Sequence, residues 1–455
     1  MIYHTDEVIQ FIKEEDVKFI RLAFFDVLGT QKNISIMPYE IERAFSEGIA
    51  FDSSSILGFG GEEHSDLFLH PDPSTITILP WRPEHGRVVR MYCKISYPNG
   101  EPFIFDTRSI LIKAIGEAKK QGLNFYFGTE KEFYLFKLND DGTSSKIPYD
   151  SAGYMDIAPL DKGENVRREI CLTLEQMGIR PESSHHEEGP GQNEIDFRYS
   201  DALKSADDVE TFTSVVKTVA AKNGLWASFE PKPLIDQAGC GLHINMSVKS
   251  DEIDELDEKS AKLSSKSAKN SSETELLKQM IAGVLNRISE LTAIFNPSPE
   301  SYERLGKFKA PKYISWSKQN RSQLIRIPAA TGEYVRAELR SPDSSSNIYL
   351  VYALLIYAGL EGIKNKMQLP PSVDLNLFDE EVLTKNQEIV SNLKTLPLSF
   401  EEAWQKCSSS DFVKQFVPKE ILSFYQKYFA SQIKESELKD KTLEEILLKR
   451  GVSLL

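Results

Sequence analysis

The chain is organised around residues 183–199, which read SSHHEEGPGQNEIDFRY. Two histidines and two glutamates precede a Gly-Pro-Gly turn, and a strand-like run follows the turn. In that run charged residues alternate with apolar ones: Glu194, Asp196 and Arg198 with Ile195, Phe197 and Tyr199. Side chains of a β-strand alternate between faces with a period of two, so the run predicts a strand with one charged face. An amphipathic surface strand has the same pattern, and this segment alone does not separate the two interpretations.

The same alternation of ionisable and apolar residues recurs in three other segments that we predict to be strands: 124–136, 242–248 and 335–340. With Glu187, which lies in the loop before Glu194, the polar faces supply these ionisable groups: Glu130, Glu132, Glu194, His243 and Glu338. Adjacent carboxylates repel each other unless a cation lies between them. Because the ligands are mostly oxygen and include no cysteine, the set predicts Mg²⁺ or Mn²⁺ rather than zinc. A network of structural ion pairs is the alternative, but it accounts poorly for the pair Glu130 and Glu132.

The segment from 301 to 340 is rich in arginine: Arg304, Arg321, Arg326, Arg336 and Arg340. A guanidinium group binds phosphate or carboxylate through two parallel hydrogen bonds. Carboxylates that hold metal ions, beside arginines that hold oxyanions, indicate phosphoryl transfer, in which positioning and charge neutralisation supply most of the catalysis.

Composition narrows the class of protein. The 455 residues favour two domains, and 40% hydrophobic with 27% charged residues is ordinary for a globular chain. The net charge of −14 argues against nucleic acid as the main partner. No apolar run reaches the roughly 18 residues of a membrane span. The four cysteines are widely spaced and no secretory signal is recognised, which predicts a cytoplasmic location.

Residues 1–104 alternate strand patterns with turns and are predicted to form a small β-rich domain, and residues 105–455 a second domain. Asp106 is a candidate N-cap for a helix over 110–121. Further helices are expected over 165–177, 206–223, 276–295 and 347–364. Residues 249–273 are rich in Ser, Lys and Glu, and we expect a mobile insertion there with no chemistry.

The polar segments belong to a set of motifs that resembles glutamine synthetases of the class I bacterial and archaeal type over nearly the whole chain. The matching runs are FDSSSI (51–56), HPDPST (70–75), GTEKEF (128–133), SSHHEEGPGQNEIDFRY (183–199), FEPKPL (229–234), GCGLHINMS (239–247), NRSQLIRIPAA (320–330) and RAELRSPD (336–343). The resemblance implies an α+β fold, with a small N-terminal β-grasp domain and a catalytic domain built on a curved antiparallel sheet flanked by helices. It also implies a homo-oligomer, a dodecamer of two hexameric rings, with each active site between neighbouring subunits.

The family's reaction is ATP-dependent formation of glutamine from glutamate and ammonium through γ-glutamyl phosphate. The resemblance implies two or more Mg²⁺ or Mn²⁺ ions per site, one held by Glu132, Glu187 and Glu194 and another by Glu130, His243 and Glu338. The other implied roles are transferred phosphate for Arg321 and Arg340, nucleotide for Arg326 and Ser247, amino-acid substrate for Arg304 and Gly239, and ammonium in the adjacent subunit's site for Asp52 and Ser55.

Three positions depart from the family pattern. Lys309, in RLGKFKAP (304–311), stands where the family carries a glutamate that closes the site and takes a proton from ammonium. A lysine there would repel ammonium by roughly 4 kcal/mol at about 4 Å and an effective dielectric constant near 20, unless it points to solvent or another acid replaces the missing one. Ala238 replaces an asparagine that often touches the amino-acid substrate. Phe378 replaces a tyrosine that some relatives adenylylate, and the C-terminal tail lacks the family's usual tryptophan-containing end.

Two other functions stay open on the sequence. One is a γ-glutamyl ligase for another amine, which would tolerate the change at Lys309. The other is a poorly active paralogue that binds nucleotide or glutamate. A full set of six ligands favours an enzyme, because binding alone would not require all of them.

Overall fold

The computed structural model describes residues 4–61, 63, 65–82, 85–251, 266–330 and 335–431. For residues 266–273 it describes only the helical backbone. The insertion predicted at 249–273 lies mostly outside the described residues, and so does the atypical C-terminal tail.

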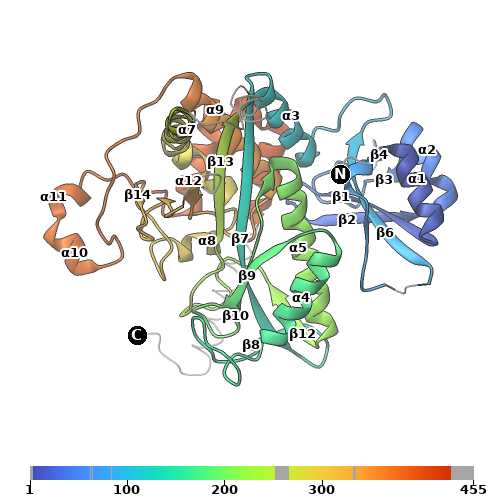
Figure 1. The fold of residues 1–455 in the computed structure, drawn as a ribbon, viewed down its shortest axis with the longest axis horizontal. Coiled ribbons are helices and arrows are strands. Elements are labelled where there is room, and N and C mark those ends of the chain that lie inside the picture. Colours follow the sequence, from blue (N-terminus) through green and yellow to red (C-terminus); the bar gives the residue numbers. More distant parts are fainter. Residues whose placement is uncertain are drawn as a thin grey trace.

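The N-terminal part contains a six-stranded mixed sheet with strand order β2-β1-β6-β4-β3 and β5 paired to β6 (Figure 1). Its strands are β1 (Val17–Phe25), β2 (Gln31–Ile36), β3 (Ile49–Asp52), β4 (Asp66–Pro71), β5 (Thr77–Ile78) and β6 (Arg87–Ser96). Helices α1 (Thr5–Glu14) and α2 (Ile41–Ser46) lie with this sheet. β1 and β2 pair antiparallel and form a hairpin, in line with the alternation of strands and turns predicted for this part.

The second sheet has ten strands, with the path β14-β15-β16-β13-β7-β10-β9 and three short strands paired to β7. The strands are β7 (Leu123–Leu138), β8 (Ser144–Pro148), β9 (Pro181–His186), β10 (Gln192–Phe197), β11 (Ser200–Asp201), β12 (Leu225–Ser228), β13 (Leu242–Ser250), β14 (Trp316–Lys318), β15 (Ile325–Ile327) and β16 (Ala337–Leu339). All four predicted polar strands are therefore present. The expected antiparallel sheet needs one correction, because β14 and β15 pair parallel and the sheet is mixed.

Helices cover the apolar face of this sheet. They include α3 (Thr107–Lys119), α4 (Glu164–Gln176), α5 (Ala202–Lys222), α7 (Lys266–Phe295) and α9 (Ile348–Lys364). Behind them, α12 (Phe400–Ser409) packs on α7 and α13 (Asp411–Phe416) packs on α9. Phe133 of β7 packs edge-on against Phe212 of α5, and Phe127 stacks on Tyr352 of α9 with ring centroids 4.0 Å apart. These aromatic contacts fix one face of β7 against helices and leave its alternate residues on the opposite face.

The short helix α8 (Pro299–Arg304) follows α7 along the chain. The short helices α10 (Glu380–Lys385) and α11 (Gln387–Val390) extend to one side of the sheet (Figure 1). The predicted cap of α3 is confirmed, because the Asp106 carboxylate accepts a hydrogen bond from the Ser109 amide. None of the helices in the described ranges is both long and apolar enough to cross a lipid bilayer.

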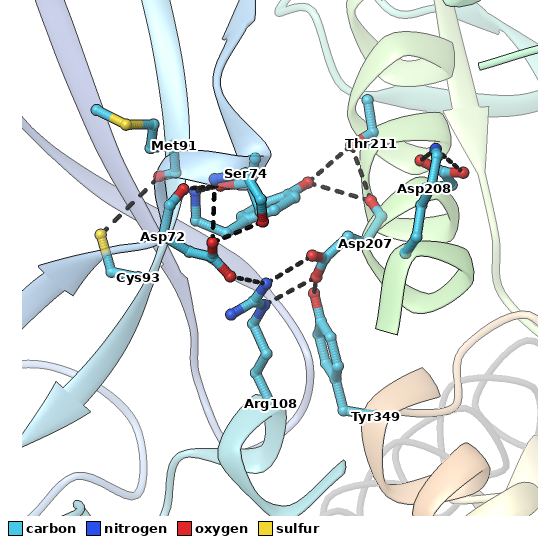
Figure 2. A network of polar contacts seen from close by, with 12 residues as sticks. Asp72, Ser74, Met91, Cys93, Arg108, Asp207, Asp208, Thr211 and Tyr349 are labelled. Atoms are coloured by element: carbon cyan, nitrogen blue, oxygen red, sulfur yellow. Dashed lines mark hydrogen bonds and ion pairs between the residues drawn. The ribbon is translucent and has the colours of Figure 1, made fainter. Parts of the chain in front are cut away.

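A buried ion cluster joins the N-terminal sheet to the helices behind the second sheet (Figure 2). Arg108 of α3 donates to both carboxylate oxygens of Asp207 on α5, at 2.9 and 2.7 Å, and to Asp72 beside β4 at 3.0 Å. Tyr349 of α9 donates to Asp207 at 2.8 Å. Since Arg108 is 1% exposed, its charge has no access to water and depends on these carboxylates.

We expect Asp207→Asn to lower the free energy of unfolding by about 3 kcal/mol, because it leaves the buried guanidinium of Arg108 under-compensated. Lys222→Met, on the same helix, removes an exposed ion pair of 3.7 Å with Glu169 and should cost less than about 1 kcal/mol. Chemical denaturation of the two variants and the parent measures both values. Equal losses for the two variants would contradict a structural role for the buried cluster.

Candidate active site

The strand register lines up the polar residues into one row across six strands. On β10, Glu194 lies opposite Glu132 of β7, and Asp196 lies opposite Glu130. Beyond β7 the row continues on β13, β16 and β15: His243 lies opposite Glu130, Glu338 opposite Asn245, and Arg326 opposite Glu338. Beyond β10 it continues on β9, where His185 lies opposite Glu194. Residues that face each other across strands share a face of the sheet, so these side chains converge.

Glu130 is compensated by its neighbours on β13. His243 Nδ1 lies 3.2 Å from Glu130 Oε2, and Asn245 Nδ2 donates to Glu130 Oε1 at 2.8 Å. Burial raises the pKa of this carboxyl, but the interactions with His243 and Asn245 outweigh it and lower the pKa to about 2. Arg336 Nε in turn donates to Asn245 Oδ1 at 2.9 Å and orients its amide.

Glu132 is held by neutral donors. Its Oε2 accepts from Gln192 Nε2 at 2.9 Å and from the Gly241 amide at 2.8 Å. Gln192 is the first residue of β10 and Gly241 directly precedes β13, so the two donors fix the carboxylate between these strands. The side chain is 8% exposed.

Glu187 and Glu194 form the most crowded acidic part of the row. Burial and then the charge of Glu132 raise the pKa of Glu187 to about 8, and burial followed by Asp196 raises the pKa of Glu194 well above its ordinary value. For Asp196, burial and the charge of Glu130 raise the pKa to about 7. Each of these carboxyl groups therefore ionises less readily because the others lie close to it. A bound cation would remove this repulsion, so the arrangement is the one expected of a cation-binding site.

His186 positions the backbone of Glu187. Its Nε2 lies 2.9 Å from Asp150 Oδ1 and its Nδ1 lies 2.7 Å from the Glu187 carbonyl oxygen. Since both ring nitrogens face acceptors, both donate in the imidazolium form. Burial lowers the pKa of His186, but the hydrogen bonds to Asp150 and Glu187 raise it overall.

Arginines compensate the other end of the row. Glu338 is fully buried, and its two oxygens accept from Arg326 Nε at 2.6 Å and from Arg340 Nε at 3.1 Å. Arg340 Nη1 also donates to the carbonyl oxygen of Arg321, whose own side chain is exposed. The structure thus brings the three predicted phosphate-binding arginines together.

Arg304 lies beside Gly239. The family resemblance predicts that these two residues bind the amino-acid substrate. Its Nη2 donates to the carbonyl oxygens of Ser341 and Pro342, while its buried Nε has no partner among the described residues. A Cβ on Gly239 would lie 2.7 Å from the Arg304 side chain and 2.3 Å from the Pro231 carbonyl oxygen, so the close approach requires glycine.

The donor set fits divalent cations. Among the described residues, three groups of three ligand atoms lie within 4.8 Å of one another, and two of them belong to this row: Glu130, Glu194 and His243, and His185, Glu187 and Glu194. Carboxylate oxygens dominate both groups, which suits Mg²⁺ or Mn²⁺. His185 is a candidate ligand that the sequence analysis did not single out, although it lies in the quoted motif.

These residues line a cleft of about 660 Å³. Its wall includes seven of the predicted ligands and arginines in addition to Glu130, Glu132 and Gly239: Glu187, Glu194, His243, Arg304, Arg321, Arg326 and Arg340. Ser247 of β13 is half-buried outside the cleft wall, and Glu338 lies behind the arginines. Asp52 and Ser55 are exposed on the N-terminal part and do not reach this cleft within the same chain.

Lys309 lies on the cleft wall with a partner that the sequence interpretation did not assign. Its Nζ forms an ion pair with Glu188 Oε1, and both residues line the cleft. Glu188 directly follows Glu187, so the second glutamate of the HHEE run was the available signal. The expected repulsion of ammonium by Lys309 is therefore offset locally by one negative charge.

Two known families match the chain. The one described as "Glutamine synthetase, catalytic domain" matches residues 105–446, and "Glutamine synthetase, beta-Grasp domain" matches residues 16–98. A protein named glutamine synthetase from Methanosarcina mazei is 44% identical over 424 residues, with 92% of each chain covered. One of the same name from Clostridium saccharobutylicum is 41% identical over 428 residues, with 93% of each chain covered.

Solved structures share the fold. A cryo-EM structure of Plasmodium falciparum glutamine synthetase superposes with a TM-score of 0.79 at 23% identity and covers 96% of each chain. A structure named GmaS/ADP complex superposes with a TM-score of 0.80 at 24% identity and covers 96% of this chain and 97% of its own.

We predict that metal-depleted protein with Glu187→Gln is more heat-stable than the parent at pH 8, and that the difference shrinks toward pH 5. Because the folded pKa of Glu187 is raised to about 8 from 4.5, the folded parent binds an extra proton between these values and loses stability as the pH rises. Saturating Mg²⁺ should stabilise the parent more than the variant.

Thermal unfolding at several pH values, with and without Mg²⁺, measures both effects. Glu182→Gln, at an exposed position of β9 outside the cleft wall, is the matched control and should follow the parent. A Glu187→Gln variant that gains as much from Mg²⁺ as the parent would exclude Glu187 as a ligand.

Proposed function

The chain belongs to the glutamine synthetase family and is an ATP-dependent amide-forming ligase, and we propose that its polar cleft forms glutamine through γ-glutamyl phosphate. The relatives at 41% and 44% identity carry the name glutamine synthetase. They favour ammonium as the nucleophile over another amine, and a working enzyme over a paralogue that only binds ligands.

The single observation that carries the proposal is the row of acidic side chains next to clustered arginines on one face of the sheet. Phosphoryl transfer between ATP and the glutamate side chain brings several negative charges together. A site for this reaction must hold the two substrates in line and neutralise their charge. The carboxylates and the arginines of this cleft supply these two requirements side by side.

We assign the metal ligands as the family resemblance implies, with one ion on Glu132, Glu187 and Glu194 and another on Glu130, His243 and Glu338. Bound there, Mg²⁺ or Mn²⁺ would neutralise phosphate charge and make the γ-phosphorus of ATP a better electrophile. The raised pKa of Glu187, and the short separations of Glu130 from His243 and of Glu187 from Glu194, support this assignment.

The chain's own residues would bind and orient the substrates. Arg321 and Arg340, which line the cleft, would hold the transferred phosphate, and Arg326 and Ser247 would contact the nucleotide. Arg304 would bind the glutamate substrate, since its unpartnered Nε offers a donor to a carboxylate next to the close backbone approach at Gly239.

We further propose a homo-oligomer, a dodecamer of two hexameric rings, in which Asp52 and Ser55 serve the cleft of a neighbouring subunit. Their exposure and their position away from the cleft of their own chain support this arrangement. Residues 1–104 would then be the β-grasp domain and 105–455 the catalytic domain. We also propose that the enzyme works in the cytoplasm in nitrogen metabolism, which its four free cysteines support.

The direct test is to measure glutamine and phosphate together with ATP, glutamate and Mg²⁺, with ammonium present or absent. The proposal expects the two products in equal amounts and a dependence on ammonium. If ammonium gives no glutamine while another amine drives phosphate release, the proposed nucleophile is wrong.

We expect Glu132→Gln and Glu338→Gln each to lower glutamine formation by about 10²–10³-fold, because each would remove one charged ligand from a different metal ion. Glutamine preserves the side-chain shape, so the fold should persist, as thermal unfolding can verify. Glu182→Gln outside the cleft serves as the control. Near-parental turnover in either cleft variant would overturn the two-metal assignment.

A mixture of Asp52→Ala and Glu338→Gln subunits should recover activity that neither variant shows alone, because some clefts would then combine an intact Asp52 with an intact Glu338. Co-expression with two affinity tags, followed by an activity assay on the doubly tagged oligomer, measures this. A monomeric mass, or an inactive mixed oligomer, would contradict shared active sites.

A further inference from the structure

The loop at 304–312 forms one wall of the cleft mouth and is tightly folded. Gly306, Phe308 and Lys309 have φ angles of 80°, 45° and 65°, in the left-handed region. The Gly306 amide donates to the Ala310 carbonyl oxygen at 3.0 Å, and the Ala310 amide donates to the Lys307 carbonyl oxygen at 3.0 Å. These two bonds close the turn and project consecutive side chains toward the cleft.

Two lysines connect this loop to its surroundings. Lys232 Nζ lies 4.2 Å from the centroid of the Phe308 ring, and Lys309 Nζ pairs with Glu188. Phe308, Lys309, Ala310 and Glu188 all line the cleft. The carboxylate of Glu188 therefore lies at the cleft mouth, one residue from the acidic group formed around Glu187.

The group that Glu188 binds is a primary ammonium. The lysine side chain ends in –NH₃⁺, which carries the same charge as the ammonium ion and offers the same type of N–H donor. The Lys309 side chain is 63% exposed, against 30% for Glu188. An ion pair this exposed is weak, so a soluble cation of the same chemistry can replace the lysine.

We propose that Glu188 is a specificity-determining residue that receives the ammonium substrate, and that Lys309 is a competitor built into the loop. This inference rests on the proposed function. When ammonium binds, the lysine leaves Glu188 and the small cation takes its place, so the charge at the carboxylate stays balanced. The competition sets the concentration of ammonium at which the cleft fills.

The two partners should then change the KM for ammonium in opposite directions. Lys309→Met frees the carboxylate and should lower this KM by about two- to fivefold, the range expected for a weak exposed pair. Glu188→Gln removes the receiving charge and should raise it by a similar factor. The KM values for ATP and glutamate should stay at parental values in both variants.

This opposition separates the proposal from a purely structural role. If the ion pair only holds the loop closed, breaking it from either side loosens the same contact and shifts the KM in the same direction. In the double variant Lys309→Met/Glu188→Gln, the KM for ammonium should match that of Glu188→Gln alone, because the competitor no longer has a carboxylate to occupy.

Steady-state glutamine formation at varied ammonium, with ATP, glutamate and Mg²⁺ saturating, is the experiment. Lys307→Met is the matched control, since Lys307 lies on the same loop, pairs with Glu303 at 3.0 Å and does not line the cleft. It should leave the KM for ammonium unchanged.

Shifts of Lys309→Met and Glu188→Gln in the same direction, or no shift in either, would overturn the inference while glutamine formation by the parent upholds the proposed function. A parent that forms no glutamine from ammonium would overturn the proposed function, and this inference with it.

Discussion

Crowding of carboxylates on one face of a single sheet is the constraint on which the rest of the structure depends. Glu132 and Glu194 lie directly opposite each other on paired strands, and Asp196 lies opposite Glu130. Like charges at this spacing destabilise a sheet unless something compensates them. The pKa of Glu187, raised to about 8 by burial and the charge of Glu132, records how incomplete that compensation is in the protein alone.

The chain compensates the row differently at its two ends. Around Glu338, two guanidinium groups donate to the two carboxylate oxygens and compensate the buried charge. Around Glu187 and Glu194, the neighbours are another carboxylate and a histidine whose pKa burial lowers. The acidic end therefore has the stronger attraction for a cation, while the arginine end has donors to offer to phosphate.

The opposite face of the sheet keeps this arrangement in place. Aromatic packing of Phe127 and Phe133 against α9 and α5 fixes the strand that carries Glu130 and Glu132. The helix α5 is fixed in turn because Arg108 of α3 donates buried hydrogen bonds to Asp207, and Arg108 also donates to Asp72 in the N-terminal part (Figure 2). The crowded acidic row is thus supported by an apolar face on one side of the sheet and by a buried, charge-paired cluster behind it.

The sequence by itself determined the polar strands and the faces on which Glu130, Glu194 and His243 lie, because the alternation of a strand is a local property with a period of two. It also supplied the helix start at Asp106 and the motifs that identify the family. Only the tertiary structure decided which charges meet. The parallel pairing of β14 with β15, the burial of Glu338 between two arginines and the ion pair of Lys309 with Glu188 join residues from separate segments. Such contacts depend on strand register and loop geometry between distant parts of the chain, which no local pattern encodes.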